Sequence, residues 1–445
     1  MRFLLNFIFK GFSVNDKKRI SKNFTSEINT NIFRTLIQLS FPPLMIMIYS
    51  LETFGLWVFL LSVPSILSIF NFNLNAAAKI EMSIYFNKKN YSKINQIFNN
   101  SLISSIIIIF LFAIVSAIFF IFFQLDLEIF QSISSNKNLI IICIFLAFFI
   151  DLFNGIFVTS ITFFGRIDIN SYLEVFFDFS GKALVVITGF FFNDLLTASL
   201  FFLGNSVIKI FTYYYFYIRL NKKLIYFNSK LFSKKEIIRL IKLSMPHYLE
   251  TVSFIIRNSL QIILLGVFFN AYVVGMVSSL KTLFFFLPIR LWGILSKLLL
   301  YEFTKSLTFR KISIFKNIFK KIFLISSVFL IIYLLLSITL GDKIFGIWLN
   351  NAYQVDILLI FLICTDVAIL ILGSAFKLIG KSINRFSLIV NIDLIISFLV
   401  IVISTLFFIE IKNYYLIFLL NIMGSIIYTF VSFFYSINLI KKISN

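Results

Sequence analysis

The sequence predicts an all-α polytopic membrane protein with about twelve transmembrane helices. Hydrophobic residues make up 60% of the 445 residues and charged residues only 13%, and the mean hydropathy is +0.99. This composition lies far outside the range of soluble globular domains. Apolar runs of about 20 residues, the length that crosses a bilayer core, recur along the chain. We expect helices at residues 28–50, 55–75, 100–123, 138–160, 171–190, 196–218, 246–268, 272–296, 321–341, 354–376, 386–409 and 414–437.

The positive charges fix the orientation of these helices. Of the 40 Lys and Arg residues, 31 fall in alternate segments that share one side of the membrane, 3 fall on the other side and 6 lie within predicted helices. Segments rich in Lys and Arg stay cytoplasmic. We therefore predict that both termini are cytoplasmic. The net charge of +21 is explained in the same way, and it does not indicate nucleic-acid binding.

One charged interval divides the predicted helices into two groups of six. We predict an N-terminal lobe at residues 1–218, a cytoplasmic linker at 219–245 and a C-terminal lobe at 246–445. Many transporters are built from two such halves with the substrate site between them. The sequence therefore predicts two six-helix lobes around a central cavity.

Cations within the predicted helices are the candidate substrate-binding residues. A charge near the bilayer centre costs roughly 2.5–3.5 kcal/mol unless a partner compensates it. Arg257, Lys281 and Lys209 lie near the middle of their helices, and we predict that they line the cavity. Gln261 and Asn258 share or flank the polar face of Arg257 and would add amide groups.

Two further cations leave two interpretations open. Arg34 and Arg290 are weaker substrate-binding candidates, because each lies close enough to the cytoplasmic end of its helix to reach the headgroups instead.

Acidic residues within the helices are candidates for charge compensation or for coupling to a cation. An acid at membrane depth must be protonated, paired or exposed to water. Asp178 stands four residues before Lys182, so an intrahelical ion pair is a structural alternative for it. The candidates are Asp366, Asp151, Glu174, Asp178 and Asp393.

The sequence contains no recognisable catalytic, metal or cofactor motif. Its two cysteines, Cys143 and Cys364, lie in apolar runs, and His247 is the only histidine. Residues 375–382 resemble a phosphate loop only loosely, because Ala375 replaces the first glycine and a membrane helix precedes them. We predict no catalytic residues, no metal and no cofactor other than a coupling H⁺ or Na⁺.

Several short strings carry a resemblance to a known family. The strings are Pro43 with residues 49–57, Asn71, Asn73 and Asn75, Gly165-Arg166, residues 341–353 and Gly380-Lys381. Through these strings the chain resembles the polysaccharide-flippase branch of the multidrug/oligosaccharidyl-lipid/polysaccharide (MOP) exporter superfamily, which includes the O-antigen and capsule repeat-unit flippases. A glycine common in that family is absent from residues 71–75, and the Gly-rich opening of its twelfth helix is replaced by residues 411–415.

The resemblance implies a MATE-like flippase of the bacterial cytoplasmic (inner) membrane. Such a protein moves an undecaprenyl-diphosphate-linked oligosaccharide from the inner to the outer leaflet by alternating access, coupled to an ion gradient. Its partners would be the polyprenyl-diphosphate-linked glycan, the lipid bilayer and glycan-assembly proteins such as a polymerase. Arg and Lys donors suit a diphosphate, which cannot be buried without partners.

Three alternatives remain open. A multidrug cation antiporter of the same superfamily would share the fold but would need an acidic cavity. A membrane-embedded glycan polymerase or ligase would need a large outer loop with catalytic Arg or His, and the longest outer loops, near residues 124–137 and 342–353, contain neither. A lipid II flippase is usually a longer chain of fourteen helices.

Overall fold

The computed structural model confirms the predicted fold class. Within the described residues every regular element is a helix, and eleven of these helices are long and apolar enough to cross a membrane. A twelfth apolar helix, Leu51–Ile66, is shorter. Asn73, Gly165 and residues 351–353, which belong to the resemblance above, lie outside the described part of the chain. The structure describes residues 14–71, 74–122, 128–130, 136–164, 166–221, 226, 228, 231–308, 312–350, 355–383 and 385–444.

The chain forms two compact units. Unit 1 contains Met1–Phe41, Phe70–Gln124 and Ser135–Met245, and unit 2 contains Pro42–Ile69, Leu125–Ser134 and Pro246–Asn445. Residues 42–69 and 128–130 thus pack with the C-terminal residues, whereas the predicted lobes are continuous in sequence. The division into two groups of six helices stays a prediction.

Two of the passages between the units fall inside helices. The chain leaves unit 1 within α2 (Val14–Ile48), between Phe41 and Pro42, and again within α9 (Lys234–Ile255), between Met245 and Pro246. A proline inside a helix removes one backbone hydrogen bond and favours a bend. At both points the chain therefore passes from one unit to the other where a proline removes a backbone hydrogen bond of the helix.

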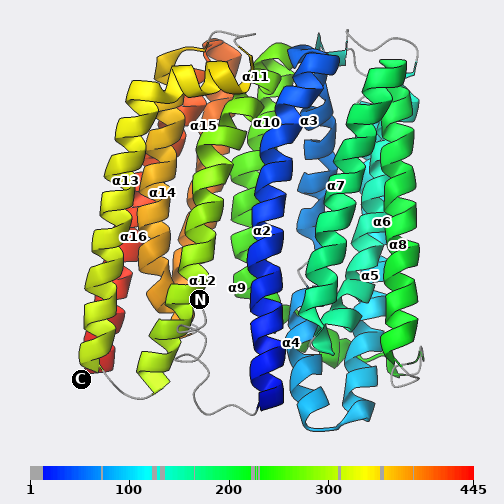
Figure 1. Cartoon of the computed structure of the whole chain (residues 1–445), viewed down its shortest axis with the longest axis vertical. Coiled ribbons are helices and arrows are strands. Elements are labelled where there is room, and N and C mark those ends of the chain that lie inside the picture. The colour runs from blue at the N-terminus through cyan, green and yellow to red at the C-terminus, as the bar shows by residue number, and fades with distance from the viewer. Residues whose placement is uncertain are drawn as a thin grey trace. The chain divides into compact units, whose positions relative to one another are not determined.

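Unit 1 is built on helices that cross at small residues. A Cβ on Gly155 would lie 2.9 Å from the Asn75 side chain, and one on Gly181 would lie 2.9 Å from that of Asn205. Ser180 donates to Asn205 at 2.7 Å, so this crossing is also hydrogen-bonded. In Figure 1, α6 (Lys137–Phe163), α7 (Ile167–Phe192) and α8 (Leu195–Asn221) lie side by side. Besides parts of α2 and α9, the unit contains α4 (Leu74–Asn87), α5 (Tyr91–Phe122), α6 (Lys137–Phe163), α7 (Ile167–Phe192) and α8 (Leu195–Asn221).

The connection from α8 to α9 is shorter than the predicted linker and is fastened to α5. Because α9 begins at Lys234, much of the predicted interval 219–245 is helical. Three asparagines of α5 recognise the backbone of the connection by side-chain hydrogen bonds of 2.7–3.2 Å. These bonds join Asn95 to Tyr226, Asn99 to Tyr226 and Asn228, and Asn100 to Leu231 and Ser233.

Unit 2 contains the remaining helices and two π-helical turns. In Figure 1, α13 (Ile312–Trp348), α14 (Ile357–Ser382) and α16 (Tyr415–Ser444) lie side by side. The π-helical turns, Ile256–Leu260 and Thr282–Phe286, each join two α-helices into one longer apolar helix. The helices are α3 (Leu51–Leu67), α10 (Gln261–Phe268), α11 (Ala271–Lys281), α12 (Leu287–Thr308), α13 (Ile312–Trp348), α14 (Ile357–Ser382), α15 (Ser387–Glu410) and α16 (Tyr415–Ser444); the short 3₁₀ turns Ser68–Asn71 and Glu128–Phe130 complete the described elements.

Polar side chains cap several of these helices. Asn270 accepts from the Val273 amide at the start of α11, and Asp356 accepts from the Leu358 amide at the start of α14. The Tyr415 hydroxyl also donates to Asp356, and the two donors hold the pKa of this carboxyl below its ordinary value. Side-chain caps satisfy amides that have no intrahelical partner.

Helices α3 and α11 approach closely at two glycines. A Cβ on Gly55 would lie 1.9 Å from the Ala271 carbonyl oxygen, and one on Gly275 would lie 2.3 Å from the Leu51 carbonyl oxygen. Small residues that allow backbones to meet are a main source of helix association in membranes.

We expect Gly55→Ala to destabilise unit 2. The added methyl group meets backbone that cannot rotate away, and such overpacking costs about 1–3 kcal/mol. The measurement is the thermal unfolding of the detergent-solubilised protein. Gly204→Ala is the matched control, because nothing lies within 4 Å of its Cβ position. Equal unfolding temperatures for the two variants would contradict the close crossing.

Candidate functional site

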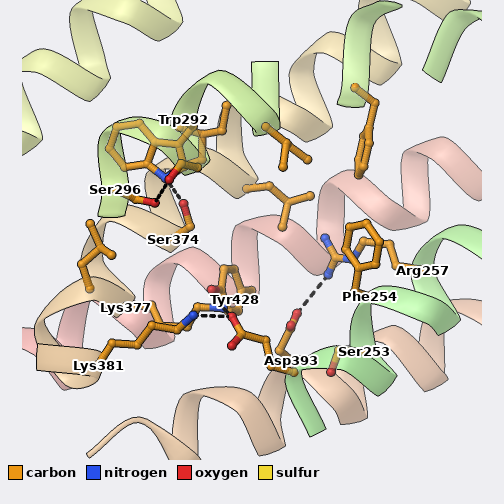
Figure 2. Close-up of a pocket in the computed structure, with 17 residues that line it drawn as sticks. Ser253, Phe254, Arg257, Trp292, Ser296, Ser374, Lys377, Lys381, Asp393 and Tyr428 are labelled. Atoms are coloured by element: carbon orange, nitrogen blue, oxygen red, sulfur yellow. Dashed lines mark hydrogen bonds and ion pairs between the residues drawn. The ribbon is translucent and has the colours of Figure 1, made fainter. Parts of the chain in front are cut away.

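The candidate site is a pocket inside unit 2. It encloses about 250 Å³ between α9, α12, α14, α15 and α16, and it combines charged, hydroxyl and aromatic side chains. Figure 2 shows these side chains converging on the space from several helices. The lining residues are Glu250, Ser253, Phe254, Arg257, Phe285, Ile289, Trp292, Gly293, Ser296, Leu370, Ile371, Ser374, Lys377, Leu378, Lys381, Asp393 and Tyr428.

Two lysines of α14 converge on one carboxylate oxygen. The ammonium nitrogens of Lys377 and Lys381 lie 2.9 and 2.7 Å from Oε1 of Glu250, which projects from α9. Lys377 also lies over the ring of Tyr428, 5.5 Å from its centroid. The spacing of four residues places the two ammonium groups on one face of α14.

Arg257 connects this pocket, through Ser425, to the buried carboxyl group of Asp366. Its guanidinium group lies 3.2 Å from an oxygen of Asp393 on α15, the contact drawn in Figure 2. It also donates to the Ser425 hydroxyl at 2.9 Å, and that hydroxyl donates to Asp366. Arg257 is 7% exposed and Asp366 is 4% exposed. A hydrogen-bonded chain thus runs from the pocket into the interior of unit 2.

Lys281 lies in the core of unit 2 and does not line the pocket. Its ammonium group donates to Oε1 of Gln261 at 2.9 Å, and both side chains are buried. Each residue stands at an end of a π-helical turn: Gln261 follows Ile256–Leu260, and Lys281 precedes Thr282–Phe286. The first of these turns also contains Arg257 and Asn258, whose side-chain amide donates to the Phe254 carbonyl. Such turns often mark functional sites.

In unit 1 the predicted cations are neutralised by the predicted acids. Lys209 on α8 lies 2.9 Å from Asp151 on α6, and Arg34 pairs with Glu174. Lys182 lies 2.9 Å from Asp178, which is the intrahelical pair proposed above as the structural alternative. These six charges therefore cancel.

Of the five predicted substrate-binding cations, Arg257 alone lines the described pocket. The lining does not include the other four, which are Lys281, Lys209, Arg290 and Arg34. Among the predicted acids, Asp393 lines the pocket, and Asp366 accepts a hydrogen bond from the Ser425 hydroxyl. The pocket thus gathers fewer of the predicted residues than expected, and they come from unit 2.

Three residues of the pocket, Lys377, Lys381 and Glu250, were not among the predicted site residues. The tenth helix was predicted to end at residue 376, which placed both lysines in a cytoplasmic segment, whereas α14 continues to Ser382. A signal was present in the helical spacing, because Lys377 and Lys381 lie 11 and 15 residues after Asp366 and share its side of an α-helix.

The described residues contain no group of three or more His, Cys, Asp or Glu side chains able to hold a metal ion. The side chains that line the pocket offer ion pairing, hydrogen bonding and aromatic contact. Three cations and two carboxylates line it, so its formal charge is positive.

Comparison with known proteins finds similarity in the fold and not in the sequence. No sequence-family description matches the chain, and no curated protein sequence matches it. Solved structures do match it over almost its whole length, at identities of 10–12% that show the fold alone.

Three solved structures illustrate this fold. A multidrug resistance MATE family transporter of the MOP superfamily, in an inward-facing conformation, has a TM-score of 0.62 and 11% identity over 92% of this chain and 99% of that chain. A MOP superfamily transporter from Pyrococcus furiosus has a TM-score of 0.60 and 12% identity over 96% of both chains; the reverse polarity of its binding pocket is described as suggesting a different function. An Asp-to-Asn mutant of the Vibrio cholerae MATE transporter VcmN has a TM-score of 0.61 and 10% identity over 96% and 98%.

Proposed function

We propose that this chain is an alternating-access flippase for an undecaprenyl-diphosphate-linked oligosaccharide, coupled to an ion gradient, and that the pocket of unit 2 binds the diphosphate. The observation that carries the proposal is the convergence of Lys377 and Lys381 on a single anionic oxygen. Two ammonium groups held this close form a site for an oxygen-rich anion, because each can donate to a different oxygen of one phosphate.

Arg257, in the π-helical turn Ile256–Leu260, adds a planar guanidinium donor to the lining of the same pocket. A guanidinium group binds phosphate through two parallel hydrogen bonds, which a lysine cannot do. Because its side chain is 7% exposed, its interaction with an anion would be weakly screened. The three cations together would offset the cost of bringing a diphosphate out of water.

The remaining lining suits the sugar next to the diphosphate. Ser253, Ser296 and Ser374 present hydroxyl groups, and Trp292 and Tyr428 present aromatic rings. Each serine hydroxyl donates to a carbonyl of its own helix, which leaves its oxygen able to accept from a sugar hydroxyl. At about 250 Å³ the pocket would hold the diphosphate and the adjoining sugar, with the rest of the glycan outside it.

A multidrug cation antiporter is the second candidate, because a multidrug resistance MATE family transporter shares the fold. The number of intramembrane cations does not by itself exclude it, since three of them are neutralised in unit 1. The composition of the pocket favours an anion: three cations face two carboxylates, whereas a site for organic cations needs the reverse balance.

Transport by the purified protein in proteoliposomes separates the two candidates. We expect faster leaflet exchange of a fluorescent polyprenyl-diphosphate lipid than in protein-free vesicles, and no uptake of an organic cation such as ethidium. Uptake of the cation without exchange of the lipid would assign the chain to the multidrug class.

A further inference from the structure

We infer that Glu250 is the resident anion of the phosphate site: its carboxylate holds Lys377 and Lys381 together in the empty pocket and gives way to a phosphate group of the substrate. This inference rests on the proposed function. It adds that the Glu250 carboxylate competes with the substrate phosphate for the two lysines.

The geometry places the Glu250 carboxylate where a phosphate oxygen would bind. Both lysine nitrogens contact the same oxygen atom, at 2.9 and 2.7 Å. The three side chains come from two helices, since Glu250 lies on α9 and both lysines lie on α14. The contact can therefore open through side-chain rotation of Glu250 without any change within α14.

The electrostatics explain why an anion site should contain a carboxylate. Two unpartnered ammonium groups side by side in a poorly hydrated pocket would repel each other and pay a large desolvation cost. Glu250 removes this cost while the pocket is empty. A phosphate carries more charge and more acceptor oxygens than a carboxylate, so it can replace Glu250 on both lysines.

Glu250 is also accessible enough to leave. Its side chain is 28% exposed, compared with 11% for Lys377 and 26% for Lys381. Once displaced, the carboxylate can turn toward the open part of the pocket that it lines. An ion pair buried on all sides could not exchange partners in this way.

The second ion pair of the pocket repeats the arrangement. Asp393 on α15 lies 3.2 Å from the guanidinium group of Arg257, and both residues line the same space as Glu250. Two carboxylates thus pair with the cations that line the pocket. A diphosphate has two phosphate groups with which to replace them.

The test is the affinity of the full-length protein for farnesyl diphosphate, measured in nanodiscs by calorimetry. If only a fraction of the protein molecules have the two lysines free of Glu250, the apparent affinity for the ligand is reduced in proportion to that fraction. We expect Glu250→Gln to bind farnesyl diphosphate about tenfold more tightly than the wild type. Glu250→Asp, whose shorter side chain reaches the lysines less well, should lie between them. Glu410→Gln, at the exposed end of α15, is the matched control and should leave the affinity unchanged.

Further ligands and variants identify what a failure would mean. Inorganic pyrophosphate tests recognition of the diphosphate without a lipid chain, and farnesol tests binding of the chain alone. If Lys377→Gln with Lys381→Gln, made in a chain that also carries Glu250→Gln, does not weaken binding of farnesyl diphosphate relative to Glu250→Gln alone, the proposed substrate site itself is wrong. If that triple variant weakens binding but Glu250→Gln alone binds no more tightly than the wild type, Glu250 is a fixed structural partner and the inference alone is overturned. Thermal unfolding without ligand confirms that each variant is folded.

Discussion

Replacing Lys377 and Lys381 by glutamine, in a chain that also carries Glu250→Gln, is expected to abolish exchange of the diphosphate-linked lipid. A hydrogen bond to a charged group contributes roughly 1.5–3 kcal/mol. Loss of both ammonium groups should therefore lower the affinity for the substrate by roughly a hundredfold or more. Glu250 is neutralised at the same time because a carboxylate left without its lysines would destabilise the fold by itself.

Two controls isolate the effect of the lysines. Glu250→Gln alone keeps both ammonium groups and should retain substrate binding. Lys182→Gln with Asp178→Asn removes an ion pair within a membrane helix of unit 1, neither residue of which lines the pocket, and should leave leaflet exchange near the wild-type rate. If the triple variant exchanged the lipid within about twofold of Glu250→Gln, the lysines would not be the phosphate ligands.

Replacing Arg257 is expected to have the second largest effect. Arg257→Ala should abolish the surface glycan in cells while the protein is still inserted in the membrane. The variant loses the donor that is shared between Asp393 and Ser425. Because removal of one partner of a buried pair costs about 3–5 kcal/mol, Arg257→Gln with Asp393→Asn is the better-matched replacement.

The conservative substitution provides the sharper comparison. Arg257→Lys keeps the charge but loses the planar fork, so we expect it to retain folding and to lower glycan export by roughly tenfold. The measurement is surface glycan per molecule of membrane-inserted protein. Normal glycan levels in the Arg257→Ala variant would remove Arg257 from the site.

The fold could be predicted from the sequence because crossing a membrane imposes strong local constraints. Long apolar runs indicated most of the helices that the structure describes, such as α15 at Ser387–Glu410 against the predicted 386–409. The ends were predicted less well where a helix continues beyond its apolar stretch. For this reason α9 begins at Lys234 and α14 ends at Ser382, beyond the predicted bounds.

The candidate site depended on two features that a hydropathy pattern does not contain. The first is the pairing of charges between helices, such as Lys209 with Asp151, which decides which cations are left for a substrate. The second is the π-helical turn at Ile256–Leu260. A regular helix would place Gln261 on the face of Arg257, but the extra residue of a π turn rotates the following segment, and Gln261 contacts Lys281 instead.

The central claim is that the pocket of unit 2 serves the passage of a diphosphate-linked lipid across the membrane. The most direct measurement is the rate at which purified wild-type protein, reconstituted into vesicles, moves a fluorescent polyprenyl-diphosphate lipid between leaflets. We expect an exchange rate well above that of protein-free vesicles, and inhibition by excess unlabelled farnesyl diphosphate. Exchange no faster than in protein-free vesicles, in a preparation that takes up an organic cation, would contradict it.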